Sequence, residues 1–245
     1  PEAVLVAEWG HPAQAIDGGY HVDFMLHCGV PGYPALFFGK AGHGRKEPCF
    51  FDRAGRGSVN DFLRHYLPLY RYIKGRGYIS IPSGNHDFAR IRAGREPEDL
   101  KVASAFLLTW PGVPFLYYGD EIGMGDNIWL YDRNGVRTPM QWNDRLNAGF
   151  SEAKPETLYA PVIDNEEFSY KVINVEAQEH DPHSLLNKMR HLIDVRKLHP
   201  IFALGAYEFL AKEHTKCLCI LRTHSDEQVL CLFNLTNSVQ QLSLD

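Results

Sequence analysis

The sequence lacks an uninterrupted hydrophobic stretch that could cross a membrane. Its longest apolar run, from Val102 to Tyr118, is broken by Pro111, Gly112 and Pro114, whereas a membrane helix needs roughly 20 consecutive apolar residues. An excess of positive charge is also missing, because 25 Lys and Arg stand against 30 Asp and Glu and give a formal net charge of -5. We therefore expect neither a membrane span nor binding to nucleic acid through bulk charge.

Paired cysteine motifs and metal motifs are absent as well. The five cysteines are an odd number and contain no C-x-x-C pair, which excludes a simple disulfide framework or zinc site and predicts reduced thiols; these favour the cytoplasm. The sequence has no H-E-x-x-H and no G-x-S-x-G. Acidic residues between Asp120 and Asn134 could ligate calcium, but their order does not match an EF-hand loop, so we expect no metal or other cofactor.

The amino-terminal part alternates between strand-like and helical patterns. Helical spacing of apolar residues begins near Ser58, Pro97 and Ser184. The strand-like runs are short, apolar or aromatic, and bounded by Gly or Pro: Val4 to Ala7, His21 to Leu26, Tyr78 to Ile81 and Val113 to Tyr118. This βα alternation predicts an α/β fold with a parallel sheet.

The pattern changes near the carboxyl end of the sequence. From Ala206 onward, short alternating runs predict a small antiparallel β module with strands at Tyr207 to Leu210, Cys217 to Arg222, Gln228 to Leu235 and Val239 to Leu244. Between Gly119 and His183 lies a long segment with little periodicity. A segment of this length inside a compact domain is usually functional.

Polar clusters follow the strand-like runs. Glu8 follows the first run, and the segment Asn85-His86-Asp87 follows the third. In a parallel α/β barrel, catalytic groups lie at the carboxyl ends of the strands. Taken singly, each cluster could equally be a helix cap or a loop hydrogen bonder. A Glu and an Asp on different strands can, however, face each other across a pocket and cleave a glycosidic bond.

Two motifs resemble the last barrel strands of the α-amylase family, glycoside hydrolase family 13. They are the segment from Ser83 to Asp87 and the segment from Pro114 to Met124. The segment Arg137 to Trp142, followed by Asn147 to Ser151, is similar to the branch that holds oligo-1,6-glucosidases, α-glucosidases and trehalose synthases. Within this branch four runs are most similar to trehalose synthases, which convert maltose to trehalose: Gly125-Asp126-Asn127, Asp132 to Arg137, Val175 to Gln178 and Leu185 to Asn187.

The resemblance implies a fold and a set of site residues. Residues 1–200 would be the carboxyl-terminal half, strands 5 to 8, of a (β/α)8 TIM barrel with a long loop at 119–183, and residues 201–245 would begin an all-β domain, a small antiparallel β-sandwich. Glu8 would be the general acid after strand 5, partly desolvated by its apolar neighbours, and Asp87 the carboxylate that stabilises the transition state. His86 and Asn85 would bind the sugar, and Arg137 would lie near the substrate entrance.

The family's nucleophile, an Asp in a Gly-Phe-Arg-x-Asp motif, does not occur in this sequence. We therefore expect a fragment that needs the missing amino-terminal half of the barrel as its partner. The resemblance implies a retaining glycoside hydrolase or transglycosylase acting on α-glucosidic bonds of gluco-oligosaccharides such as maltose. Phe88 follows the His-Asp pair where trehalose synthases have an acidic residue, so a trehalose synthase stays an alternative. A non-catalytic carbohydrate-binding fragment is the alternative from another class.

Overall fold

The computed structural model describes residues 2–25, 32–37 and 49–244, which form two compact units. The first unit consists of Pro1–Pro82, Ala105–Phe115 and Val195–Asp245, and the second consists of Ser83–Ser104 and Leu116–Asp194. Within the described ranges, the helices are all too short or too polar to span a bilayer. The predicted boundary at residues 200 and 201 stays a prediction.

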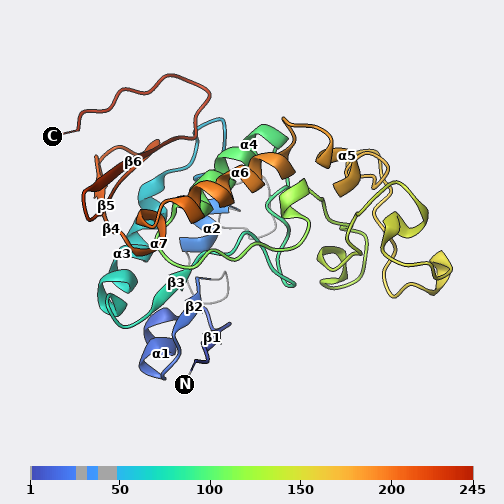
Figure 1. The fold of residues 1–245 in the computed structure, drawn as a ribbon, viewed down its shortest axis with the longest axis horizontal. Helices are drawn as coiled ribbons and strands as arrows, with labels where there is room; N and C mark the ends of the chain where they lie inside the picture. Colours follow the sequence, from blue (N-terminus) through green and yellow to red (C-terminus); the bar gives the residue numbers. More distant parts are fainter. Residues whose placement is uncertain (1, 26–31, 38–48, 245) are drawn as a thin grey trace. The chain divides into compact units, whose positions relative to one another are not determined.

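The first unit contains a three-stranded parallel sheet in the order β1-β2-β3 (Figure 1). The strands are β1 (Val6–Ala7), β2 (Val22–Phe24) and β3 (Tyr78–Ser80), and the helices α1 (Pro12–Asp17), α2 (Gly32–Phe37) and α3 (Val59–Ile73) alternate with them along the chain. Val6 pairs with Val22, and Asp23 with Ile79. The first three predicted strands and their parallel alignment are thus confirmed, except that Leu26 lies outside the described residues.

The fourth predicted strand does not form as a regular element. In the run from Val113 to Tyr118, only Phe115 makes a bridge, a parallel one to Pro82. Pro114 has no backbone N–H to donate to a neighbouring strand. In the second unit, the N–H of Tyr117 donates to the hydroxyl of Ser83 at 2.8 Å instead of to a strand carbonyl. A hydrogen bond to a side chain thus takes the place of the strand pairing that the apolar run predicted. A barrel segment of four strands stays a prediction.

The three predicted helices are confirmed as α3, α4 (Pro97–Thr109) and α6 (Leu185–Leu198). Ser58 caps α3 by accepting a hydrogen bond from the backbone N–H of Asn60 at 3.2 Å. Within the first unit, aromatic rings form the packing between α3 and the end of α4. The Trp110 ring lies 4.9 Å from Tyr66 and 5.5 Å from Phe209, between ring centroids. Such aromatic burial dominates the energetics of a core.

The carboxyl-terminal strands form an antiparallel sheet in the first unit. They are β4 (Ala206–Leu210), β5 (Cys217–His224) and β6 (Glu227–Asn234), which confirms the first three predicted runs. The fourth run, Val239 to Leu244, is not a strand, and Val239 is 97% exposed. Arg222, buried on β5, donates to the carbonyl oxygens of Thr109 and of Ile201 in α7 (Ile201–Leu204). The second layer of a β-sandwich stays a prediction.

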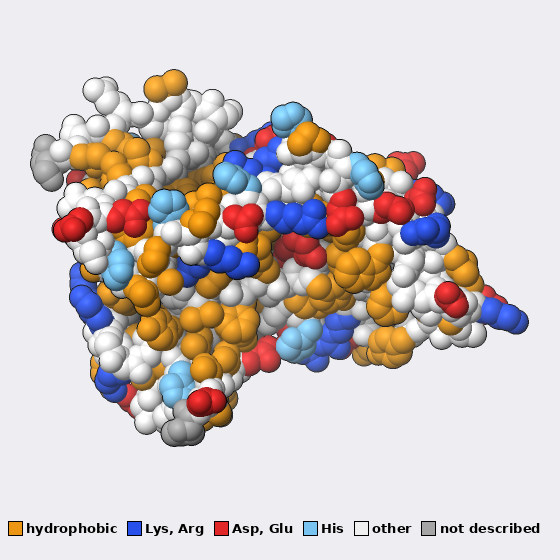
Figure 2. Space-filling view, in the orientation of Figure 1, with side chains coloured by type: hydrophobic (Ala, Val, Ile, Leu, Met, Phe, Trp, Pro, Cys, Tyr) orange, Lys and Arg blue, Asp and Glu red, His pale blue; other side chains and the backbone are white. Residues whose placement is uncertain are grey.

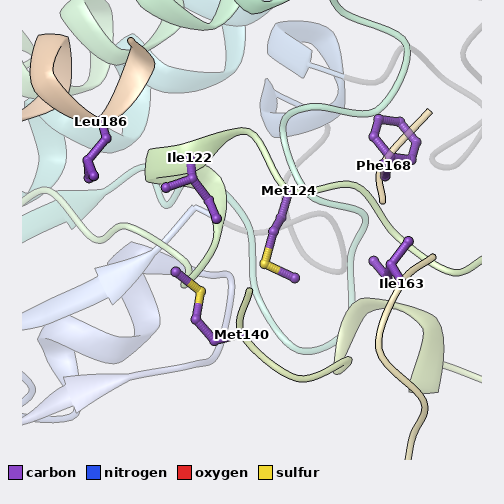
Figure 3. Packing of buried hydrophobic residues seen from close by; sticks show 6 residues of the cluster. All are labelled: Ile122, Met124, Met140, Ile163, Phe168 and Leu186. Atoms are coloured by element: carbon purple, nitrogen blue, oxygen red, sulfur yellow. The ribbon is translucent and has the colours of Figure 1, made fainter. Parts of the chain in front are cut away.

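The second unit is built around the long segment after Gly119. Its elements are short: η1 (Asp120–Ile122), η2 (Asn134–Val136), η3 (Leu146–Gly149), η4 (Pro155–Thr157) and α5 (Val175–Glu179). They enclose a hydrophobic cluster of Ile122, Met124, Met140, Ile163, Phe168 and Leu186 (Figure 3). Gly125 is required here, because a Cβ at this position would lie 2.2 Å from the Phe168 ring. The segment thus has its own core and can hold polar groups in fixed positions.

The surface carries both signs of charge. Figure 2 shows acidic and basic side chains interspersed on the visible face, as the nearly balanced composition predicts. Cys49, Cys217, Cys219 and Cys231 are buried, and Cys28 lies outside the described residues. The expectation of reduced thiols stays a prediction.

Candidate functional site

The segment Asn85 to Asp87 forms a tight turn in the second unit. The side-chain oxygen of Asn85 accepts hydrogen bonds from the backbone N–H groups of Asp87, at 2.8 Å, and of Phe88, at 3.0 Å. Asn and Asp commonly close turns in this way. Asn85 therefore fixes the backbone that presents His86 and Asp87, which are respectively exposed and half-buried.

Asp87 receives two guanidinium groups on the same carboxylate oxygen. Arg133 Nη1 lies 2.7 Å and Arg137 Nη2 lies 3.0 Å from its Oδ1. His86 Nε2 is 3.6 Å from the same oxygen, and Arg137 Nε donates to the His86 carbonyl oxygen at 2.8 Å. Hydrogen bonds from charged donors are short and strong, and they hold the carboxylate in place. The geometry thus suits Asp87 to stabilise positive charge on a substrate.

Arg133 was not predicted from the sequence. Arg133 and Arg137 both lie in the run Asp132 to Arg137 that resembles a known family, but only Arg137 was given a role from that resemblance. Their separation of four residues was the available signal, because a turn of η2 between them brings both side chains to one carboxylate.

A buried carboxyl group supports this turn from within the second unit. Asp120 Oδ2 accepts a hydrogen bond from the Ser83 hydroxyl at 2.6 Å, and its Oδ1 accepts one from the backbone N–H of Ile91 at 3.2 Å. Burial raises the pKa of Asp120 to about 7, although the Ser83 hydrogen bond and Arg90 act in the opposite direction. Asp120, at the start of η1, thus holds both ends of the segment that carries Asp87.

Arg90 and Asp126 form a fully buried ion pair next to Asp120. Arg90 Nη1 lies 2.9 Å from Asp126 Oδ1, and the backbone N–H of Arg90 donates to the other oxygen at 3.0 Å. Arg90 Nε also donates to the carbonyl oxygen of Tyr118, whose ring lies 4.7 Å below the guanidinium. Asp120 and Asp126 thus accept hydrogen bonds within the protein. This is a use of their carboxyl groups other than calcium binding.

A pocket of about 500 Å³ opens beside Arg137 in the second unit. Its lining combines aromatic side chains with a carboxyl group and a guanidinium: Tyr118, Glu121, Arg137, Trp142, Phe150 and Tyr159. Burial raises the pKa of Glu121 above its usual value. Apolar walls with a few convergent polar groups are typical of small-molecule sites.

Glu8 belongs to the first unit and follows β1 directly. Its side chain is exposed in this chain, and its partial desolvation in the completed barrel stays a prediction. The backbone after it is held by Asp23, whose Oδ1 accepts hydrogen bonds from the N–H of Trp9 at 3.0 Å and of Gly10 at 3.4 Å. Asp23 is completely buried, and burial raises its pKa. In the sequence, Asp23 could have been recognised as a buried polar residue because it is the single acidic residue inside an apolar run.

The second unit therefore brings together four of the five predicted site residues, namely Asn85, His86, Asp87 and Arg137. Glu8 lies in the other unit, and its action together with Asp87 stays a prediction.

Comparison with known proteins identifies relatives of the chain. The family model described as the catalytic domain of alpha amylase matches residues 55–205. The trehalose synthase/amylase of Mycobacterium tuberculosis is 46% identical over 149 residues, which cover 60% of this chain and 25% of that protein. The trehalose synthase of Pimelobacter is 44% identical over 154 residues, covering 61% and 27% of the two chains. The oligo-1,6-glucosidase of Parageobacillus thermoglucosidasius is 28% identical over 219 residues, covering 73% and 38%.

The fold is also similar to a solved structure. Bacillus licheniformis trehalose-6-phosphate hydrolase superimposes with a TM-score of 0.73 over 95% of this chain and 47% of that one, at 23% identity. The chain thus spans less than half the length of each relative named here.

Proposed function

The chain belongs to the alpha-amylase family of glycosidases and transglycosylases, and we propose that it supplies part of the active site of a retaining enzyme for α-glucosidic bonds. The observation that carries the proposal is the Asp87 carboxylate, fixed by Arg133 and Arg137 at 2.7 and 3.0 Å. An ionised carboxylate suits an oxocarbenium-like transition state, in which positive charge develops on the sugar.

The remaining residues take the roles that the family resemblance implies. Glu8 protonates the departing glycosidic oxygen as general acid. His86 and Asn85 lie beside Asp87 on the same turn and contact sugar hydroxyls, with Asn85 also holding the turn. Arg137 lies between Asp87 and the aromatic pocket, so a sugar bound at Asp87 would extend into that pocket.

The nucleophile comes from outside these residues. A carboxylate of the amino-terminal half of the barrel attacks the anomeric carbon, the bond to the leaving oxygen breaks, and the proton from Glu8 completes the leaving hydroxyl. Water then attacks the glucosyl-enzyme, returns a proton to Glu8 and releases glucose. We call this chain together with that half, in one polypeptide or in a complex, the assembled enzyme.

Isomerisation of maltose to trehalose is the second candidate reaction. It is favoured by the identity of 44 to 46% with two trehalose synthases over about 60% of this chain. In this reaction the released glucose stays bound and attacks the glucosyl-enzyme through its anomeric hydroxyl, so that no water is consumed.

Incubation with maltose tests both reactions and the binding-only alternative. The assembled enzyme, made by co-expressing the chain with the amino-terminal half of a relative, should release glucose, trehalose or both, and chromatography of the products distinguishes hydrolysis from isomerisation. The chain alone should release neither, since loss of one carboxylate from a cooperating catalytic set costs on the order of 10⁴-fold. Binding of maltose without turnover by the assembled enzyme would support a carbohydrate-binding fragment instead.

A further inference from the structure

The Asp87 carboxylate has an unsymmetrical environment. In the described part of the chain, three cationic or imidazole side chains contact its Oδ1: Arg133, Arg137 and, at a longer distance of 3.6 Å, His86. Arg137 is also anchored on the His86 carbonyl oxygen, whereas the second contact of Arg133 is the carboxylate of its neighbour Asp132 at 3.5 Å. Both guanidinium groups thus lie on Oδ1 and neither lies on Oδ2.

Hydrogen bonds hold the backbone of the loop that carries Arg133. The N–H of Asn127 donates to the Gly135 carbonyl oxygen at 3.0 Å, and the Tyr117 hydroxyl donates to the Val136 carbonyl oxygen at 2.9 Å. Gly135 permits this close approach, because a Cβ there would lie 2.3 Å from the Asn127 oxygen. These contacts fix the backbone of the loop from Asn127 to Val136, and this loop carries Arg133.

Resting on the proposed function, we propose that Arg133 is a positioning residue: it holds Oδ1 of Asp87 so that Oδ2 faces the sugar. Two donors on one oxygen restrict rotation of the carboxylate more than one donor does, and charge-assisted hydrogen bonds are the strong ones. Arg137 alone would leave the carboxylate free to turn about that single bond. Preorganised groups of this kind act in the transition state without having to reorganise.

Loss of a surface ion pair without a functional role would leave turnover unchanged. The Arg133 side chain is 51% exposed and that of Asp87 26%, and exposed pairs of this kind contribute little to stability. Loss of Arg133 should therefore change turnover while leaving the melting temperature almost unchanged.

The chain offers a matched control in the second unit. Arg190 is 50% exposed and pairs with Glu179 at 2.7 Å, so Arg190→Ala removes an ion pair of the same length whose arginine is equally exposed. In the assembled enzyme, Arg133→Ala should lower kcat about 10- to 100-fold, the loss expected for a hydrogen bond to a charged group, with KM changed less than kcat. Arg190→Ala should leave both parameters at their wild-type values.

Rescue separates positioning from general stability. Arg133→Lys should recover part of the lost kcat, because an ammonium group restores the charge but not the planar geometry. Added guanidinium at millimolar concentration should raise the kcat of Arg133→Ala and not that of Arg190→Ala, since the site of Arg133 is open to solvent.

The outcomes distinguish this inference from the proposed function. If Asp87→Asn is inactive while Arg133→Ala matches Arg190→Ala in kcat, Arg133 has no positioning role and the proposed function stands. If Asp87→Asn keeps wild-type activity, the proposed function fails and the role of Arg133 fails with it. Should Arg133→Ala not fold, Arg133→Lys decides: a kcat equal to that of wild type would overturn the inference, and a selective loss of kcat would support it.

Discussion

The buried carboxyl of Asp120 should make the stability of the chain depend on pH in a direction that is unusual for an acidic residue. Burial raises its pKa from 3.8 to about 7. Between these two values the folded state holds a proton that the unfolded state has lost, so the free energy of unfolding falls as the pH rises. A difference of about 3 pH units, at about 1.4 kcal/mol per unit, corresponds to a loss on the order of 4 kcal/mol between about pH 4 and pH 7.

Asp120→Asn should remove this dependence. An Asn side chain resembles the protonated acid, and its oxygen can still accept the hydrogen bond from Ser83 or from the backbone of Ile91. Urea unfolding of the wild type and the variant should therefore diverge with pH: the variant gains stability relative to the wild type as the pH rises from about 5 to 8. The exposed carboxyl of Asp144 provides the control, because Asp144→Asn should leave the pH dependence as it is in the wild type.

A direct titration accompanies the unfolding experiment. The carboxyl carbon of Asp120, followed by NMR, should titrate near pH 7 in the folded chain. If the stability curves of wild type and Asp120→Asn run parallel and the carbon titrates near 4, burial does not dominate at this site and the reasoning is refuted.

Three further predictions concern folding and association. Ser58→Ala should lower the free energy of unfolding by about 1 kcal/mol through loss of the α3 cap, and Ser58→Asp, which keeps an acceptor, should not; equal losses in thermal unfolding would argue against the cap. Arg90→Met should cost roughly 3 to 5 kcal/mol in urea unfolding, because it leaves the Asp126 carboxylate buried without its partner; a loss below about 1 kcal/mol would contradict this. The chain alone should self-associate in sedimentation experiments, since β1 and β3 are the outer strands of the three-stranded sheet within the described residues and Val6 is 38% exposed; a monodisperse monomer would contradict it.

The regular elements of the fold could be predicted from the sequence where local signals agreed. The cap at Ser58 with apolar residues at helical spacing identified α3, and Pro97 marked the start of α4. The apolar run from Val113 predicted a strand that does not form. Its proline and the Ser83 hydroxyl change which groups the backbone can pair with. An apolar run shows which side chains are buried, but it does not show which groups the backbone pairs with. The strand prediction for Val113 to Tyr118 therefore failed, because these residues are apolar without pairing as a strand.

The candidate site was predictable only as far as its motif extends. The segment from Asn85 to Asp87 stood out because it follows a strand, and Arg137 because of the family resemblance. Arg133 and Asp23 contribute through long-range contacts, 46 and 14 residues away in sequence from Asp87 and Trp9. No local pattern encodes such contacts. The desolvation of Glu8 concerns the completed barrel and stays a prediction.

The most direct test of the account compares the roles of Glu8 and Asp87 through the leaving group. Single-turnover kinetics of the assembled enzyme would be measured with α-glucosyl fluoride, whose leaving group needs little protonation, and with maltose, whose leaving group needs a proton. We predict that Glu8→Gln keeps most of its rate on the fluoride and loses it on maltose. Asp87→Asn should lose on the order of 10⁴-fold on both substrates. Equal loss for Glu8→Gln on both substrates, or recovery of Asp87→Asn on the fluoride, would contradict the proposed active site.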